Sequence, residues 1–200
     1  MLFNSLSFIV FLVIVLVLYY SKLFKWTSKK RMLLFASYAF YGLWNPPLVI
    51  LLWISTVVDW TAGKRLAVED NQRKRKFWLL LSMCVNLGFL AFFKYGDFLL
   101  ENFVSLVNSF GIDYKVRPMD IILPMGISFY TFQTMSYTID MYKRKIEPAR
   151  TFLDFALYVT FFPQLVAGPI VRAKDLITQF YEEKRATYSQ FVWGVFLLTI

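Results

Sequence analysis

Long apolar runs, separated by short basic stretches, constrain this chain more than any other feature. Residues 3–20 and 77–93 contain no charged residue, and about 20 apolar residues are enough to cross a bilayer as a helix. The whole composition agrees, because 58% of the residues are hydrophobic and the mean hydropathy is +0.52. This excludes a disordered chain and argues against a soluble domain. We therefore expect an all-α, polytopic transmembrane protein.

The other apolar segments are shorter or interrupted. Asn45-Pro46-Pro47 ends any helix between residues 32–44 and 48–62, because proline lacks the backbone donor and restricts the preceding residue. These two runs predict either a tight hairpin in a locally thin membrane or two helices held against neighbours. A further span is expected at 119–141, and residues 94–118, with balanced charges, are expected to form an amphipathic or interfacial segment.

The basic residues predict the orientation. Residues 21–31, 63–76 and 143–150 hold 15 of the 22 lysines and arginines, and they share one side if each expected span crosses once. The positive-inside rule makes that side cytoplasmic, with 63–76 as a cytoplasmic loop and the N-terminus outside. A net charge of +9 placed in this way indicates contact with anionic headgroups rather than nucleic acid.

The residue inventory excludes several kinds of active site within these 200 residues. There is no histidine, and therefore no His general base and no His-ligated metal. The single cysteine, Cys84, cannot form an intramolecular disulfide or a CxxC metal site. A new apolar run begins at Tyr188 and has only about half of a span's length by Ile200. We expect residues 1–200 to be one truncated transmembrane domain, the N-terminal part of a longer one.

A polar stripe marks the 119–141 span. Helical spacing places Tyr130, Gln133, Tyr137 and Asp140 on one face. Such a face turns away from lipid, towards other helices or a cavity. It is either a hydrogen-bonded seam between helices or the lining of a substrate channel.

Residues 152–171 are apolar but are broken by Pro163, Gly168 and Pro169. Gln164 and Arg172 add polar groups to this stretch. It is either a kinked structural helix or a re-entrant tunnel wall, which we would expect to pack against the Tyr130, Gln133 and Tyr137 face.

Asp59 follows an apolar run and lies close in sequence to Lys64 and Arg65. The simplest interpretation is an interfacial ion pair. The basic run 73–76 is most simply a headgroup anchor, with binding of an acidic cytoplasmic partner as the alternative.

Three stretches resemble one known family. They are residues 123–133 (LPMGISFYTFQ), with Pro124 and Gly126, running on to Asp140; residues 161–170 (FFPQLVAGPI); and Asp59 to Gly63 (DWTAG). Together they are similar to the membrane-bound O-acyltransferases, most closely to bacterial alginate O-acetyltransferase membrane subunits. The likeness covers nearly all 200 residues.

The resemblance implies a ring of short, tilted and re-entrant helices around a tunnel. It implies a multi-pass enzyme of a bacterial inner membrane that passes an acyl group, such as acetyl, from a cytoplasmic donor to a hydroxyl of an extracytoplasmic polysaccharide. The donor would be a substrate, acetyl-CoA or an acyl carrier, with no permanently bound cofactor. The expected partners are the bilayer, a polysaccharide acceptor and either an extracytoplasmic acetyltransferase-like protein or a cytoplasmic acyl-donor protein.

The family's essential histidine lies in its C-terminal half. It matches no position here, so the resemblance implies that residues 1–200 alone are inactive and assigns them no catalytic residue. The motifs do not separate polysaccharide acetylation from D-alanyl transfer to teichoic acid. A secondary transporter and a non-catalytic membrane scaffold are the alternatives of another class.

Overall fold

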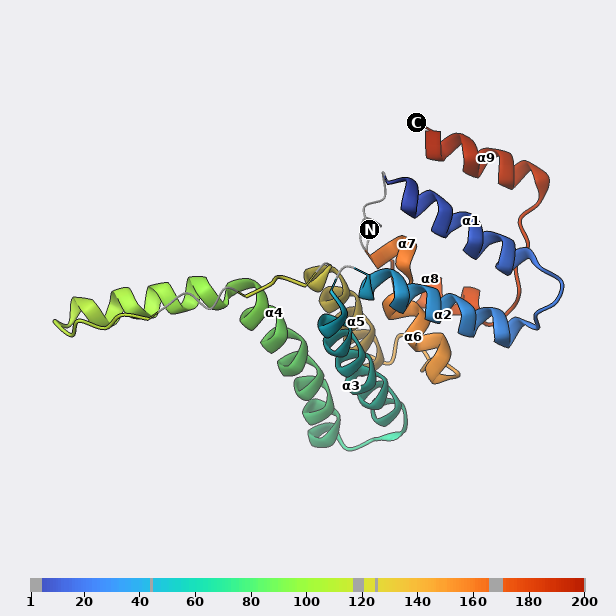
Figure 1. The fold of residues 1–200 in the computed structure, drawn as a ribbon. Helices are drawn as coiled ribbons and strands as arrows, with labels where there is room; N and C mark the ends of the chain where they lie inside the picture. Colours follow the sequence, from blue (N-terminus) through green and yellow to red (C-terminus); the bar gives the residue numbers. More distant parts are fainter. Residues whose placement is uncertain (1–4, 44, 117–120, 125, 166–170, 200) are drawn as a thin grey trace.

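The computed structural model describes residues 5–43, 45–116, 121–124, 126–165 and 171–199, and this part of the chain contains helices and turns but no strand (Figure 1). The all-α class is as predicted. In chain order, the elements are α1 (Leu6–Tyr20), α2 (Trp26–Gly42), η1 (Pro46–Leu48), α3 (Val49–Val68), α4 (Gln72–Ser109), α5 (Ile127–Tyr142), α6 (Phe152–Thr160), α7 (Phe162–Leu165), α8 (Ala173–Leu176), η2 (Ile177–Phe180) and α9 (Tyr188–Thr199).

Local sequence sets several helix boundaries. Ser5, Asn71 and Thr151 precede α1, α4 and α6, and each accepts a hydrogen bond from a backbone N–H in the first turn. Such caps satisfy donors that have no partner inside the helix. The chain leaves α2 before the two prolines, which start the short turn η1, as the sequence predicted.

Helices α3, α4 and α5 pack against one another and form the centre of the molecule. Helix α6 packs on α2, α3 and α5, and joins this trio to the N-terminal helices. In Figure 1, α3 and α5 run side by side, with α6 between them and the α7–α8 region.

Two helical segments are long and apolar enough to cross a membrane, Pro46–Val68 and Gln72–Ser109. Helix α1 is apolar but shorter, with 15 residues, and most of its exposed side chains are apolar, including Leu6, Ile9 and Val13. A helix that is apolar on all sides is suited to lipid or a core rather than to water. These features agree with a membrane protein, whereas the five single crossings remain a prediction.

Two expected segment boundaries are wrong. The predicted 63–76 loop is helical except near residues 69–71, because α3 continues to Val68 and α4 begins at Gln72. Helix α4 also continues through 94–109, so the predicted span at 77–93 is only its first half. Charged residues do not end a helix, and residues 72–109 contain no proline. The second half of α4 extends away from the other helices (Figure 1).

The predicted break within 152–171 is present in the part that the structure describes. Helix α6 ends at Thr160, and the short α7 begins at Phe162. Pro163 lies in the first turn of α7, where its missing N–H costs little. Gly168 and Pro169 lie outside the described residues.

Candidate functional site

Six buried polar side chains form a cluster, here called the polar seam, where α3, α4 and α5 meet. All are at most 1% exposed. The polar seam consists of Ser55 and Asp59 on α3, Ser82 and Asn86 on α4, and Thr134 and Thr138 on α5. Each helix contributes two residues spaced by four, which places both on one face.

Asp59 is the centre of the polar seam. Ser82 Oγ donates to Asp59 Oδ1 at 2.5 Å, and Asn86 Nδ2 donates to both carboxylate oxygens at 2.9 Å. Ser55 Oγ donates to Asn86 Oδ1 at 2.5 Å and lies 3.4 Å from Asp59 Oδ2. The carboxylate is therefore held by neutral donors of α4, and Ser55 of its own helix supports them through Asn86.

The predicted ion pair of Asp59 with Lys64 or Arg65 is wrong. Because α3 continues past these residues, both cations lie further along the helix and contact aromatic rings instead. Lys64 Nζ is 4.9 Å from the centroid of the Trp60 ring, and Arg65 Cζ is 5.8 Å from that of Trp78.

Gly63, one turn after Asp59, has a steric role. A Cβ atom at this position would lie 2.7 Å from both Cε1 and Oη of Tyr137. Only glycine leaves room for the Tyr137 side chain of α5. The Asp59–Gly63 motif thus joins α3 to α4 through its carboxylate and to α5 through its missing side chain.

The neighbouring face of α5 contacts α6. Gln133 Nε2 donates to the carbonyl of Tyr158 at 2.7 Å, and Tyr158 Oη donates to the carbonyl of Gln133 at 3.0 Å. In a continuous helix the Tyr158 carbonyl would accept from the amide of Phe162, four residues later. Because α6 ends before Phe162, that amide donates to Ser37 Oγ instead. Gln133 therefore supplies a donor at the helix break, as the predicted hydrogen-bonded seam requires.

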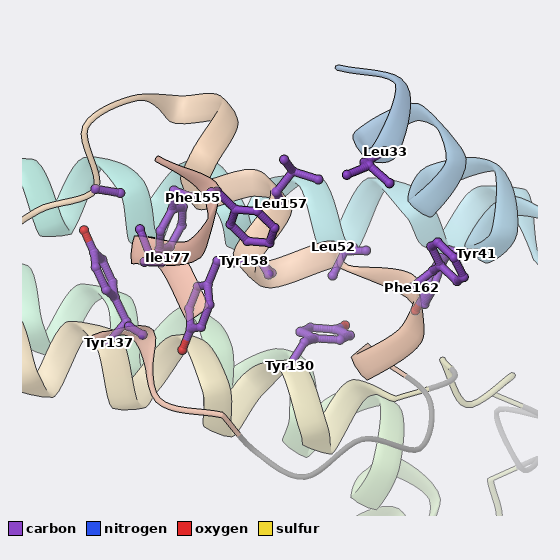
Figure 2. Close-up of a cluster of buried hydrophobic side chains, with 14 of the residues drawn as sticks. Leu33, Tyr41, Leu52, Tyr130, Tyr137, Phe155, Leu157, Tyr158, Phe162 and Ile177 are labelled. Carbon is purple, nitrogen blue, oxygen red and sulfur yellow. The ribbon is translucent and has the colours of Figure 1, made fainter. Parts of the chain in front are cut away.

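Aromatic rings fill the space between α5 and α6. The centroid of Phe155 is 4.7 Å from that of Tyr137 and 6.0 Å from that of Tyr158, and the three rings are drawn together in Figure 2. Figure 2 also shows Tyr130 directed towards Tyr41 and Phe162. The hydroxyls of Tyr41 and Tyr130 are buried and make no hydrogen bond within the described part of the chain.

The remaining predicted site residues lie in different surroundings. Asp140 is half-buried in the last turn of α5, Gln164 is buried in α7, and Arg172 is exposed at the start of α8. The predicted stripe is thus continuous and buried from Tyr130 to Tyr137. A channel-lining role remains a prediction for all six candidates, which are Tyr130, Gln133, Tyr137, Asp140, Gln164 and Arg172.

The motif residues before α5 are structural. Pro124 is buried, and its carbonyl accepts from the amide of Ile127. Gly126 precedes α5 with φ of 71°, a left-handed conformation that favours glycine. Pro163 is exposed, and the wall predicted for 163–169 lies mostly outside the described residues.

Arg75 corrects the interpretation of the basic run 73–76 as a headgroup anchor for one of its four residues, whereas the other three are exposed. Arg75 is 2% exposed, and its guanidinium donates to four backbone carbonyls: Leu66, Glu69, Met141 and Tyr142. These carbonyls lie in or just after the last turns of α3 and α5, where helix carbonyls lack a partner inside the helix. Arg75 therefore ties the two helix ends together.

Two lysines of the 21–31 stretch are buried as well. Lys29 Nζ lies 2.8 Å from Glu183 Oε1, and Lys30 Nζ lies 2.5 Å from Asp154 Oδ1. Thr151 Oγ1 also donates to Asp154, at 2.7 Å. These pairs, here called the ionic seam, join the start of α2 to α6 and to the segment that follows η2.

No group of three or more Cys, Asp or Glu side chains in the described ranges is placed to hold a metal ion. Of the polar seam, the sequence predicted only Asp59 and missed Ser55, Ser82, Asn86, Thr134 and Thr138. The signal for them was the spacing of four between polar residues in three otherwise apolar helices, which is visible only when the helices are compared.

Curated relatives support the motif-based resemblance. The chain is 37% identical over 196 residues to a protein from Pseudomonas aeruginosa named "Probable alginate O-acetylase AlgI", and 36% identical over 196 residues to a protein of the same name from Azotobacter vinelandii. Both matches cover 97% of this chain. A "Peptidoglycan O-acetyltransferase" from Helicobacter pylori is 32% identical over 197 residues and matches 86% of this chain.

The chain spans only 36% to 38% of the length of these relatives. No protein-family model matches the chain, and no solved structure matches it significantly.

Proposed function

The chain belongs to the membrane-bound O-acyltransferase family, and we propose that it forms part of an enzyme that O-acetylates an extracytoplasmic polysaccharide. The observation that carries this proposal is the 37% identity, over 97% of the chain, to a protein named as an alginate O-acetylase. The relative named for peptidoglycan shares the reaction with a different polymer. The acceptor is therefore proposed as a polysaccharide class that includes alginate.

The role proposed for these residues is to build the wall around the reaction path. The polar seam and Arg75 join α3, α4 and α5, with neutral donors rather than a cation at Asp59. With no histidine in the sequence, the reacting base is assigned to no residue here. Tyr41 and Tyr130 are two of the residues whose buried hydroxyls make no hydrogen bond within the described part of the chain, and these hydroxyls can donate to a substrate oxygen.

The finer proposal concerns the path of the acetyl group. It enters from a cytoplasmic donor, acetyl-CoA or an acyl carrier, and leaves on the extracytoplasmic side of an inner membrane. An extracytoplasmic acetyltransferase-like protein is the proposed partner that delivers it to the polymer. The distribution of basic residues supports an N-terminus outside the cytoplasm.

Gene deletion and complementation in the source organism test the function. Deletion of the full gene is expected to abolish base-labile acetyl groups on the extracellular polysaccharide, and the wild-type gene is expected to restore them. Release of D-alanine instead of acetate would favour teichoic-acid transfer. Unchanged acetylation with a lost solute uptake would favour a transporter.

Variants in the same strain test the wall. Tyr130→Phe removes a buried hydroxyl and should lower acetylation while the protein level stays normal. Ser109→Ala, on the exposed part of α4, is the matched control and should retain full acetylation. Equal acetylation by both variants would remove Tyr130 from the path.

Orientation is tested by cysteine labelling in a Cys84→Ser background. Asp70→Cys places a thiol at a position where the side chain is 89% exposed, between α3 and α4. An impermeant maleimide should label it only after the membrane is opened. Labelling of intact cells would reverse the proposed topology.

A further inference from the structure

A cavity of about 260 Å³ lies between α1, α2, α7 and η2, apart from the polar seam. Its walls are mostly apolar, with Leu12 and Leu16 from α1, Phe161 and Phe162 beside α7, and Phe180 from η2. One of its lining residues, Lys184, is charged. The cavity is thus an apolar slot with a cation at its edge.

Hydrogen bonds fix the polar edge of the cavity. Tyr19 Oη donates to the carbonyl of Lys184, and Trp26 Nε1 donates to the carbonyl of Phe180, both at 3.0 Å. The buried Lys29–Glu183 pair holds the same segment. The slot is therefore already formed in the structure and does not require a change of fold to open.

The charges at this edge are predominantly basic. Lys184 is exposed and forms no ion pair with any residue that the structure describes. Lys22 and Lys25 are exposed on the turn between α1 and α2, whose two ends both contact the 180–184 segment. Of the acidic residues there, Glu183 is paired with Lys29 and Arg185, which leaves Glu182 as the opposing charge.

Helix α1, which forms one wall, has apolar side chains on its exposed surface, as a lipid-facing helix has. An apolar slot that borders lipid and ends at unpaired lysines matches a phospholipid with a negative headgroup. Basic pockets between membrane helices bind such headgroups.

We propose that this cavity binds an anionic membrane phospholipid, with part of one acyl chain between α1 and the α7–η2 region and the headgroup at Lys184, Lys22 and Lys25. Bound in this way, the lipid would fasten α1 to the 173–184 segment. The proposal is independent of the acetylation chemistry.

Native mass spectrometry of the full-length protein in a mild detergent tests the proposal. Phosphatidylglycerol and phosphatidylethanolamine with identical acyl chains are added in equal amounts, and the retained lipids are counted. The wild type should retain phosphatidylglycerol in preference. Lys184→Gln should weaken its binding about fivefold, which corresponds to about 1 kcal/mol for one lysine near a lipid surface. The control Lys115→Gln removes an exposed lysine of the segment after α4 and should change nothing.

A second variant tests the acyl slot. Leu16→Trp places a larger ring in the cavity and should reduce retention of phosphatidylglycerol, whereas Val13→Trp, on the same helix but outside the lining, should not. Equal retention of both lipids, or no effect of Lys184→Gln, would overturn the proposal.

A different occupant is also detectable. In a Cys84→Ser background, Leu16→Cys should react with a lipid-soluble maleimide, and added phosphatidylglycerol should slow the reaction. A thiol that stays unreactive with and without lipid would show that another protein segment fills the slot, and would overturn the lipid assignment.

Discussion

The polar seam and the ionic seam each contain a buried carboxylate, but the two carboxylates have different hydrogen-bond partners. Asp59 is surrounded by hydroxyl and amide donors from α3 and α4. Asp154 is bonded by the ammonium of Lys30 and the hydroxyl of Thr151. Both aspartates are at most 1% exposed.

The difference shows where each seam is vulnerable. In the ionic seam, one interaction balances a buried charge, so loss of one partner leaves the other charge buried alone. In the polar seam, several weaker hydrogen bonds stabilise the carboxylate together, and loss of the carboxylate leaves neutral donors unpaired. We therefore expect the largest cost where a single cation balances a fully buried carboxylate, at the Lys30–Asp154 pair.

The largest expected effect comes from Lys30→Met. It leaves the Asp154 carboxylate buried without its cation, and breaking a buried pair costs about 3–5 kcal/mol. The measurement is the free energy of unfolding in a denaturing-detergent titration followed by tryptophan fluorescence.

The double variant Lys30→Met with Asp154→Leu should recover most of that loss, because neither charge remains. A single variant that costs under about 1 kcal/mol would mean that Asp154 takes up a proton or reaches water, and the contrast between the seams would disappear.

Asp59→Leu should have the next largest effect. It leaves Ser82 and Asn86 without their carboxylate acceptor, and each buried group left unsatisfied costs about 1–3 kcal/mol. Asp59→Asn keeps an acceptor oxygen and should cost less in the same titration. Asp70→Asn, at an exposed aspartate, is the control and should stay near wild type. A larger loss for Asn than for Leu would show that the charge itself is required.

The contact between Gly63 and Tyr137 should give a smaller effect. Gly63→Ala places a methyl group against the Tyr137 ring, and overpacking typically costs about 1–3 kcal/mol. In a Tyr137→Leu background the same change should cost almost nothing, because the ring is gone. Gly88→Ala is the matched control, since no atom lies within 4 Å of its Cβ position. An equal cost of Gly63→Ala in both backgrounds would contradict the steric explanation.

Apolar periodicity and prolines predicted much of the helical layout. The break before Pro46 and the break near Pro163 were found from the sequence, because proline acts locally on its own turn. The stripe Tyr130, Gln133 and Tyr137 was found in the same way, since it depends only on the period of one helix.

Beyond the segment boundaries and the Asp59 ion pair, the errors concern basic residues whose partners are remote in sequence. Lys30 meets Asp154 across 124 positions, and Arg75 meets Tyr142 across 67. A local count of charges places such residues at a membrane surface, because it carries no information about distant carbonyls and carboxylates. The resemblance located the Asp59–Gly63 motif, but only the packing of α4 and α5 explains why those two residues occur together.

The smallest expected effect comes from the second pair of the ionic seam, Lys29 with Glu183. The hydrogen bond from Lys29 is the main cause that holds the pKa of Glu183 below its ordinary value of 4.5. A carboxyl whose pKa is lowered by folding contributes stability above its ordinary pKa and loses it as the pH falls through the lower, folded value. Glu183→Gln should therefore lower the thermal unfolding midpoint slightly at pH 7, and the difference from wild type should shrink below pH 4.5. The effect is small because the Glu183 side chain is 26% exposed, so that water screens the pair.

Glu182→Gln, at an exposed neighbour without an ion pair among the described residues, is the control and should show no such pH dependence. If the difference between Glu183→Gln and wild type stayed constant from pH 7 to pH 3.5, Glu183 would stabilise this segment through packing rather than through its charge.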